Sequence, residues 1–428
     1  MPCDLLSACL RVRTVSNQMS IQAPRIPVSF AIGLLLATGL MPRVSPGAEP
    51  ASTERYAYQD CALEAGPPAE VGRAAGHFWF PSLHAVQGND IFCEANLTDD
   101  KPQGEWPAAL CLSRDGGATW RRVRDLESCG PISVSLGPRK ILVMPYETWP
   151  VSPGDKRNAK AKGTVVTLSE AGAATVERAA MTFEGFPRDL APYHVGEVYL
   201  LANGNILSLK NGALFTTLYG KFAGDTKDSC WAASSTNHGL TWRFLATVAN
   251  GPELAGAVEG ANESSTCRLA DGRLMTVCRT GGTPDCKAYS ADDGVTWSAP
   301  QRMEGILCVE PQLVRLANGV ILLSGGRPGL FVWICTDGEG NKWERLNLAA
   351  HHNRHVNNPA LRYADAFCEA KGVNPPQSTS YTGMVAVGPD QALIVYDRLG
   401  NGWKGAPGPW GADDAIFCIR LKATRKLP

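Results

Sequence analysis

Short β-prone runs separated by turn residues recur along the chain, and the middle of the sequence shows this pattern most completely. Apolar and polar residues alternate in part over residues 265–269, and residues 270–273 (Ala-Asp-Gly-Arg) supply a tight turn. Residues 274–278 then return as a second strand, which predicts a hairpin. A third predicted strand, residues 287–290, ends in the octet SADDGVTW at residues 290–297. A fourth strand should follow the tryptophan.

The octet fits the pattern S-x-D-x-G-x-T-W, which has a physical basis at three positions. Asp292 can cap its own turn, Gly294 can take a positive φ, and Trp297 can pack back onto the sheet. One such unit leaves an apolar face on each side, so it needs similar units beside it. Two more well-formed copies and a degenerate one occur at residues 113–120, 235–242 and 336–343.

Six hairpins can be recognised from Phe78 onward, each with a turn rich in Gly, Asp or Asn. Repeats spaced by roughly 45 to 70 residues with about four strands each are typical of a β-propeller. We therefore predict an all-β fold, a six-bladed β-propeller of four-stranded antiparallel blades over residues 76–428, with no helix of useful length. The six turns are at residues 88–90, 137–139, 203–205, 271–273, 318–320 and 389–391.

Composition agrees with this fold and limits the classes of binding partner. The chain has 428 residues with 44 Gly and 30 Pro, which suits an all-β protein with many turns. Lys and Arg together number 41, as do Asp and Glu, so the formal net charge is zero. No basic face is implied, and this argues against nucleic acid or a membrane surface as a partner.

The N-terminal region carries a targeting pattern. Residues 28–41 form a short apolar run that follows several arginines and precedes small residues near Ala48. This predicts a signal peptide at residues 1–48, with Met19 as an alternative start, and therefore export to the periplasm or the medium. An uncleaved anchor helix is the alternative. Residues 49–75 would form an N-terminal segment, a leader remnant and loop of which part could pair with the last blade. No other run is long enough to span a bilayer.

Cysteine usage leaves two alternatives open. Of 14 cysteines, Cys3 and Cys9 lie in the predicted leader, and the remaining 12 are compatible with disulfides in an oxidising compartment. Cys93, Cys278 and Cys418 lie within predicted strands, where a buried thiol is equally consistent. No CxxC pair occurs among the 12, which argues against a zinc or thioredoxin-like site.

We predict no cofactor and no metal site. His351, His352 and His355 lack firm metal-ligand spacing and are interpreted as a surface loop. Other polar and aromatic candidates lie near the C-terminus. Residues 396–398 (Tyr-Asp-Arg) could supply a charge near a site or an ion pair between blades, and Trp403 and Trp410 are candidate sugar platforms.

The octets resemble the Asp-boxes of the sialidase (neuraminidase) superfamily, and the resemblance covers about residues 76–424. Sialidases cleave a ketoside whose anomeric carbon carries a carboxylate, which would repel a carboxylate nucleophile. The family therefore uses a tyrosine activated by a glutamate, with an aspartate as acid/base and three arginines around the substrate carboxylate. Sugar-binding and structural propellers also carry the octet.

Several catalytic positions of the family can be matched in this sequence. Tyr381 in TSYTGM resembles the nucleophile, and Glu263 in NES resembles its partner, although many sialidases have proline where this chain has Ser264. Arg279 follows Glu263 by 16 residues and resembles the second clamp arginine. Arg327, among glycines after the next hairpin, stands where the third could be. Ordinary packing or solvated loop charges are the alternative interpretations of these residues.

The first clamp position departs from the family pattern. Sialidases open their first blade with Arg-Ile-Pro, and alignment on Pro81 puts Trp79 where the arginine belongs. Either the anionic group is held differently or the sugar is not a standard sialic acid; Trp79 itself could stack on a sugar or pack in the core. In the following loop we choose Asp100 over Asp99 as the acid/base, and keep Asp99 as a substrate-binding candidate.

The leading interpretation is a sialidase-like, retaining exo-glycosidase that removes a terminal acidic sugar, a sialic acid or a related keto-sugar acid, from a glycan. Tyr381 would attack the anomeric carbon while Glu263 takes its proton. Asp100 would protonate the leaving oxygen and then activate water. Arg279 and Arg327 would hold the anion.

Two further functions fit the same scaffold. A carbohydrate-binding propeller without turnover is favoured by Trp79 in place of the arginine. A polysaccharide lyase acting on uronic acids could use His194 as base and a tyrosine as acid.

Overall fold

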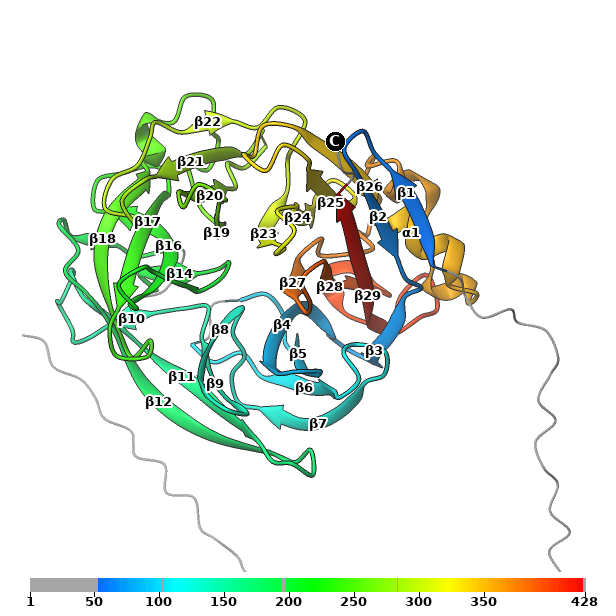
Figure 1. The fold of residues 1–428 in the computed structure, drawn as a ribbon. Helices are drawn as coiled ribbons and strands as arrows, with labels where there is room; N and C mark the ends of the chain where they lie inside the picture. Colours follow the sequence, from blue (N-terminus) through cyan, green and yellow to red (C-terminus); the bar gives the residue numbers. More distant parts are fainter. Residues whose placement is uncertain (1–52, 102–103, 194–197, 283, 426–428) are drawn as a thin grey trace, which may run out of the picture. The chain divides into compact units, whose positions relative to one another are not determined.

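The computed structural model describes residues 53–101, 104–193, 198–282 and 284–425 (Figure 1). The predicted signal peptide (residues 1–48) and Met19 lie outside these residues. The described chain is all-β apart from five short helices, as predicted. Among the described residues, no helix has the length and apolar character needed to cross a bilayer.

Three hairpin units form separate four-stranded antiparallel sheets. In each, the predicted Gly- or Asp-rich turn joins the first two strands, and the octet joins the last two. Their strands are β4 (Trp79–Gln87), β5 (Asp90–Asn96), β6 (Ala108–Ser113) and β7 (Arg121–Leu126); β19 (Ser264–Arg268), β20 (Leu274–Cys278), β21 (Cys286–Ser290) and β22 (Gln301–Arg302); and β23 (Val309–Arg315), β24 (Ile321–Gly326), β25 (Leu330–Cys335) and β26 (Trp343–Asn347).

The second and third units share one 11-stranded sheet, because β12 and β18 pair in parallel from Thr182↔Thr241 to Glu184↔Arg243. The turn predicted at residues 203–205 is wrong: these residues separate β14 from β15, which both pair with β16. The true hairpin turn lies at residues 209–213. The strands are β8 (Ile132–Gly137), β9 (Lys140–Met144), β10 (Trp149–Pro150), β11 (Ala159–Leu168), β12 (Ala174–Glu184), β13 (Leu190–Ala191), β14 (Leu200–Ala202), β15 (Leu207–Ser208), β16 (Leu214–Phe222), β17 (Ser229–Ser235) and β18 (Thr241–Ala249).

The sixth unit combines segments from both ends of the described chain. Strand β29 pairs with β28 along one edge, and with β2 and β3 along the other. The N-terminal segment thus contributes strands to the sheet that the C-terminal residues form. The strands are β1 (Glu54–Ala57), β2 (Cys61–Ala65), β3 (Ala69–Ala74), β27 (Thr382–Ala386), β28 (Gln391–Arg398) and β29 (Asp414–Arg425).

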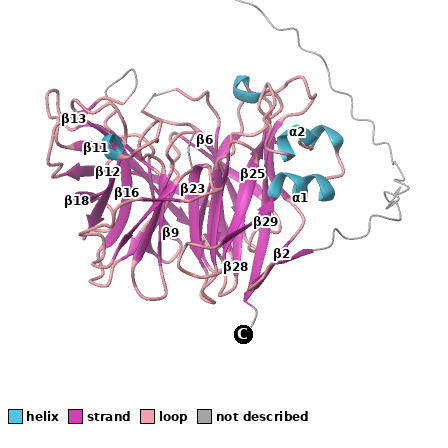
Figure 2. Ribbon diagram, turned by 90° about the horizontal axis from the view of Figure 1, so that it is seen from above, coloured by secondary structure: helices cyan, strands magenta, loops and turns pink. Residues whose placement is uncertain are grey.

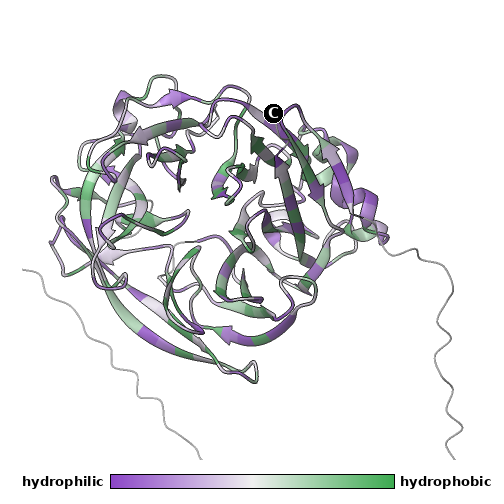
Figure 3. Ribbon diagram, in the orientation of Figure 1, coloured by the Kyte–Doolittle hydropathy of each residue, from purple (hydrophilic) through white to green (hydrophobic). Residues whose placement is uncertain are grey.

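In the described chain, apolar side chains between the units form six main clusters, besides a small one around Val198, Leu201 and Tyr219. Each pair of consecutive units shares one cluster, and a further cluster containing Phe78, Cys93, Leu393 and Cys418 joins the last unit to the first. Figure 1 shows the units following one another around a common centre, with β4, β8, β14, β19, β23 and β27 nearest to it. Figure 3 shows hydrophobic and hydrophilic residues interspersed along the strands.

The helices were not expected from the sequence. Helix α1 (Leu348–His355) and the shorter α2 (Asp365–Cys368) lie beside the β25–β29 side of the molecule in Figure 2. The surface-loop interpretation of the histidines is therefore wrong, since all three lie on α1, where His351 and His352 are buried. An eight-residue helix is too short for its period to stand out in the sequence. The 3₁₀ turns are η1 (Gly251–Glu253), η2 (Pro359–Leu361) and η3 (Gly402–Lys404).

The cysteines of the described residues are all free thiols, and most of them are buried. Of the two alternatives, disulfides or buried thiols, the second is therefore correct for Cys93, Cys278 and Cys418.

The octet turns have the predicted geometry. At residues 290–297, Asp292 Oδ1 accepts a hydrogen bond from Thr296 N at 2.9 Å, and Trp297 Nε1 donates to Gly294 O at 3.0 Å. Gly294 has φ +95°, and a Cβ there would lie 2.6 Å from the Phe215 ring. Only glycine meets both conditions, which explains its place in the octet.

These contacts predict how the octet contributes to stability. Asp292→Ala removes acceptors for Thr296 N, Thr296 Oγ1 and Ser290 Oγ, so we expect a loss of about 1–3 kcal/mol. Asp292→Asn should cost less, because Asn237 makes the corresponding bonds in another octet. Urea unfolding of the two variants measures the difference, and equal losses would contradict this account.

Candidate active site

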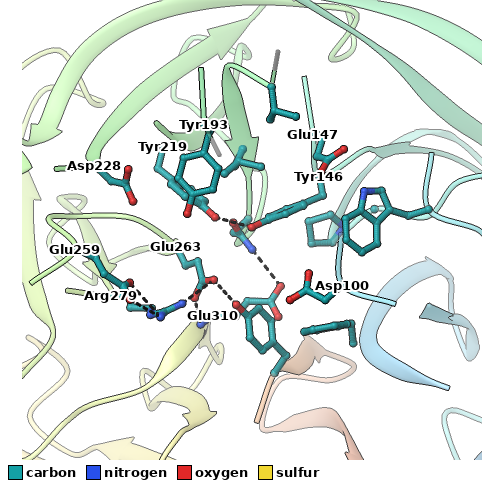
Figure 4. Close-up of a pocket in the computed structure, with 18 of the residues that line it drawn as sticks. Asp100, Tyr146, Glu147, Tyr193, Tyr219, Asp228, Glu259, Glu263, Arg279 and Glu310 are labelled. Atoms are coloured by element: carbon teal, nitrogen blue, oxygen red, sulfur yellow. Dashed lines mark hydrogen bonds and ion pairs between the residues drawn. The ribbon is translucent and has the colours of Figure 1, made fainter. Parts of the chain in front are cut away.

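A cavity of about 780 Å³ opens where the inner strands of the units meet (Figure 4). Several of its lining residues, among them Glu263, Arg279 and Tyr381, lie just before a unit's first strand or just after its second strand. In an antiparallel pair, the start of one strand lies beside the end of the next, so these two positions meet at the same end of each sheet. Several units can therefore contribute side chains to one cavity.

Glu263 and Arg279 face each other because of the hairpin register. Ser264 pairs with Cys278 at the open end of β19 and β20, and Arg279 N donates to Glu263 O one position further on. The Arg279 guanidinium lies 3.0 Å from Glu263 Oε1 and 3.0 Å from Glu259 Oε2. Burial alone would lower the pKa of Arg279, but the carboxylate of Glu263 raises it, so this guanidinium stays charged.

The Tyr381 hydroxyl donates a short hydrogen bond to Glu263 Oε1. Tyr381 immediately precedes β27, 118 positions from Glu263 in the sequence, and both side chains line the cavity. Burial, and then the nearby Glu263 carboxylate, raise the pKa of Tyr381 well above its usual value. The phenol is therefore protonated at neutral pH and bonded to the group that could remove its proton.

Glu310 completes the environment of Glu263. Its backbone N–H donates to Glu263 Oε2 at 2.8 Å, and its own buried side chain lines the cavity. Glu310 has φ +41°, at a bulge between Val309 and Gln312 in β23. Burial raises the pKa of Glu310 well above its usual value, and Glu263 raises it further. A protonated carboxyl group is therefore available at this wall of the cavity.

Asp397 holds the segment that precedes the tyrosine. It is fully buried and accepts hydrogen bonds from Ser378 Oγ at 2.7 Å, from Thr379 N at 2.9 Å and from Phe80 N at 3.3 Å. The sequence suggested a charge near the site or an ion pair between blades for this residue. It instead positions the backbone on both sides of the Tyr381 ring, which meets Phe80 edge to face at 4.9 Å.

Arg327 lines the cavity beside Tyr381. Its guanidinium carbon lies 5.3 Å from the centre of the Tyr381 ring and 5.2 Å from that of Trp403, and one nitrogen donates to Thr379 O at 2.8 Å. Among the described residues, no carboxylate lies within ion-pairing distance of it. Arg327 thus differs from Arg279, which already contacts two carboxylates.

Asp99 and Asp100, in the loop after β5, differ in their position relative to the cavity. Asp100 lines the cavity, and Figure 4 shows its carboxylate pointing inward from the side opposite Glu259 and Arg279. Asp99 is not among the residues that line the cavity, and its half-exposed carboxylate forms an ion pair with Lys101. Only Asp100 is placed to meet a molecule in the cavity.

Trp79 lies outside the cavity. It is fully buried, stacks on His77 at 4.3 Å, and donates from Nε1 to Thr98 O at 2.8 Å. The next residue, Phe80, lines the cavity instead. Phe80 has φ +47° at a bulge in β4, so the inward side chain is one residue later than alignment on Pro81 indicated.

Sequence reasoning missed one whole wall of the cavity. Tyr146, Tyr193 and Tyr219 line it, with the Tyr146 and Tyr219 hydroxyls 2.6 Å apart and the rings of Tyr193 and Tyr219 edge to face at 5.8 Å. No shared motif links these three tyrosines, so the sequence offered no signal for the group. Charged residues not singled out there also line the cavity: Glu147, Lys221, Asp228 and Glu259.

The cavity carries more acidic than basic groups. Six carboxyl groups line it against three cations, Lys221, Arg279 and Arg327. Burial raises the pKa of Asp228 to about 6, which reduces its charge near neutral pH. With Glu310 protonated as well, part of the excess negative charge is removed.

The remaining candidates do not enter this cavity or are not described. His194, the candidate base of a lyase, lies outside the described residues. Trp403 contacts Arg327 at the edge of the site, whereas Trp410 lies against Arg398, 5.2 Å from its guanidinium carbon. The helix α1 histidines lie elsewhere, against strands of the sixth unit.

Comparison with known proteins gives a family and several structural relatives. Residues 156–372, half of the chain, match the model of the BNR repeat-like domain. No curated protein matches the sequence.

Three solved structures illustrate the structural similarity. A protein of unknown function from Dyadobacter fermentans has a TM-score of 0.57 at 18% identity, with 84% of this chain and 99% of that chain covered. The α-L-arabinanase of Penicillium chrysogenum, complexed with arabinobiose, has a TM-score of 0.53 at 13% identity over 83% and 98% of the two chains. A mutant of Trypanosoma rangeli sialidase with trans-sialidase activity has a TM-score of 0.47 at 12% identity over 86% and 58%.

The environment of Tyr381 predicts its ionisation. Because its pKa is well above the usual value of about 10, no phenolate should form at this position at neutral pH. An ultraviolet difference titration of the native protein against Tyr381→Phe should show no missing ionisation below about pH 10. A phenolate that titrates near neutrality and disappears in the variant would contradict this prediction.

Proposed function

The chain belongs to the BNR repeat-like domain family, and on that premise we propose that it is a retaining exo-glycosidase that removes a terminal acidic sugar from a glycan. The observation that carries the proposal is the hydrogen bond from the Tyr381 hydroxyl to Glu263 inside the cavity. The sugar would be a sialic acid or a related keto-sugar acid.

We also propose that the six units form a six-bladed β-propeller. The six apolar clusters between neighbouring units, including one between the last and the first, support this architecture. Pairing of β2 and β3 with β29 would then close the ring with strands from both ends of the chain.

The first chemical step transfers the sugar to the protein. The Tyr381 oxygen attacks the anomeric carbon and its proton passes to Glu263, while Asp100 protonates the departing glycosidic oxygen. In the second step Asp100 takes a proton from water, the water oxygen attacks the anomeric carbon, and Glu263 returns its proton to the departing Tyr381 oxygen. Two displacements at one carbon retain its configuration.

A neutral nucleophile suits a sugar whose anomeric carbon carries a carboxylate. A glutamate at the position of Tyr381 would approach that carboxylate as a second anion, whereas the phenol carries no charge until its proton leaves. The Arg279 guanidinium forms an ion pair with Glu263 and so holds this base in its orientation before the reaction. Its role is therefore to position the base.

Arg327 is the group best placed to hold the sugar carboxylate. It is the cavity arginine without a carboxylate partner among the described residues, and it lies against the Tyr381 ring. A guanidinium can bond a carboxylate through two N–H groups, so a single arginine can both bind and orient the acid. This differs from the three-arginine arrangement that the resemblance implied.

A neutral sugar such as an arabinofuranoside is a second candidate. The six carboxyl groups against three cations in the cavity favour it, and the Penicillium structure with arabinobiose has a related fold. In that case Arg327 would bond to sugar hydroxyls. A glycan partner and export of the mature chain are common to both proposals.

Replacement of the proposed nucleophile should abolish turnover and leave binding intact. We expect Tyr381→Phe to lower kcat on an aryl ketoside of sialic acid by about 10²–10⁴-fold, since the attacking oxygen is lost. Tyr289→Phe is the matched control, because the Tyr289 hydroxyl donates to Glu339 O outside the cavity. Mass spectrometry after reaction with a 3-fluoro sugar fluoride should find the adduct on Tyr381.

Two results would count against this assignment. Equal turnover by Tyr381→Phe and native protein would remove the nucleophile role. Glycan binding by the native protein without turnover of any aryl glycoside would indicate a binding module, and unsaturated uronate products would indicate a lyase.

Arg327 should decide between acidic and neutral sugars. We expect Arg327→Gln to raise KM for the acidic ketoside by about 10–100-fold, because a charge-assisted bidentate contact is lost. The methyl ester of the same substrate should be affected much less. Arg73→Gln, which alters an exposed ion pair with Glu70, is the control. Turnover of an aryl arabinofuranoside in preference to the ketoside would favour the neutral-sugar candidate.

A further inference from the structure

A second group of convergent side chains lies where helix α1 meets strand β1, apart from the cavity (Figure 1). His351 and His355 are one helical turn apart on α1 and project toward Glu54 of β1. Glu54 Oε2 lies 3.2 Å from His351 Nδ1 and 3.4 Å from His355 Nε2. The three potential ligand atoms lie within 4.8 Å of one another.

The surroundings of His351 orient its ring for coordination. Its Nε2 lies 2.8 Å from Gly66 O, and because a carbonyl only accepts, Nε2 carries the proton. Nδ1 is then the unprotonated nitrogen; it accepts a hydrogen bond from the Tyr56 hydroxyl at 2.8 Å and lies 3.2 Å from Glu54 Oε2. A bound cation would take the place of the tyrosine proton at Nδ1. A histidine whose other ring nitrogen donates to a backbone carbonyl is the usual arrangement in protein metal sites. His351 is fully buried, and burial lowers its pKa, so the ring is neutral as coordination requires.

The spacing of the ligand atoms also fits a small divalent cation. A tetrahedral zinc ion about 2.0–2.2 Å from each ligand atom places those atoms roughly 3.3–3.5 Å from one another. Two of the separations, 3.2 and 3.4 Å, already meet this condition. The third separation, between the two histidine nitrogens, is within 4.8 Å, so the mostly buried His355 ring must move closer to His351 when the ion binds. Glu54 is about one-third exposed, so solvent can supply a fourth ligand.

Arg354 is the competing partner for Glu54. Its Nε and one terminal nitrogen each lie 3.0 Å from Glu54 Oε2, and it also bonds to the Tyr56 hydroxyl. Burial alone would raise the pKa of Glu54, but hydrogen bonds from Tyr56 and Arg354 lower it to about 2, so the carboxylate is ionised over the working range of pH. Arg354 is nearly half exposed and can turn into solvent.

We propose that Glu54, His351 and His355 bind one zinc-like divalent cation, in competition with the Arg354 guanidinium. The bound ion would link β1, an edge strand of the sixth unit, to helix α1. Its role would be to hold the N-terminal strand in place, and it is independent of the glycosidase proposal.

Calorimetric titration of the full chain with ZnCl₂, after removal of metal by a chelator, tests the site. We expect one saturable site, at least tenfold weaker binding by His355→Ala, and at least tenfold tighter binding by Arg354→Gln. Zinc should also raise the midpoint of thermal unfolding in the native protein and more so in Arg354→Gln.

Weaker zinc binding by His355→Ala together with tighter binding by Arg354→Gln would distinguish a metal site from a purely structural group of side chains. His238→Asn removes an exposed histidine from an octet turn elsewhere and should bind zinc like the native protein. Equal zinc binding by His355→Ala and native protein would overturn the proposal. So would the absence of saturable binding in both the native protein and Arg354→Gln, whose folding can be checked by circular dichroism.

Discussion

The carboxylate of Glu263 is the interaction on which the site depends. Three donors reach it from three units: the Tyr381 hydroxyl, the Arg279 guanidinium and the Glu310 amide. A buried carboxylate is costly unless its oxygens are hydrogen-bonded, so Glu263 is stable only while the three units stay in register. Conversely, the apolar clusters between units keep the inner strands close enough for these bonds to form. Fold and site therefore stabilise each other.

Backbone strain is concentrated around the same cavity. Phe80, Glu310, Arg327 and Ser380 all have positive φ, between +41° and +63°, although none of them is glycine. Such conformations cost of order 1–3 kcal/mol each and persist only where surrounding contacts enforce them. Here Asp397 bonds to Phe80 and to the segment before Ser380, and Ser380 Oγ donates to Gly329 O at 2.9 Å. Buried hydrogen bonds thus hold the strained backbone at Phe80 and Ser380, beside the Tyr381 side chain.

The sequence predicted what depends on local chemistry. The octets and five of the six hairpin turns followed from turn residues. One of these turns is at residues 271–273, and the register of its hairpin brings Glu263 and Arg279 together in the structure. The sequence did not predict features that depend on an irregularity of a single residue. A bulge in β4 turns Phe80 rather than Trp79 inward, and alternation alone cannot reveal it. The sequence also could not predict the wall of three tyrosines, because Tyr146 and Tyr219 meet only through the packing of the second and third units.

Activation of the phenol and binding of an acidic sugar each require an arginine in the cavity. Arg279 contacts Glu263 and Glu259, so it neutralises the base instead of remaining open to an anion. With an aromatic residue at the first clamp position, Arg327 is the cation left for the substrate. A single guanidinium fixes one end of a sugar but not its rotation about that contact. In the proposed reaction, that rotation must therefore be limited by other surfaces of the cavity, among them the wall formed by Tyr146, Tyr193 and Tyr219.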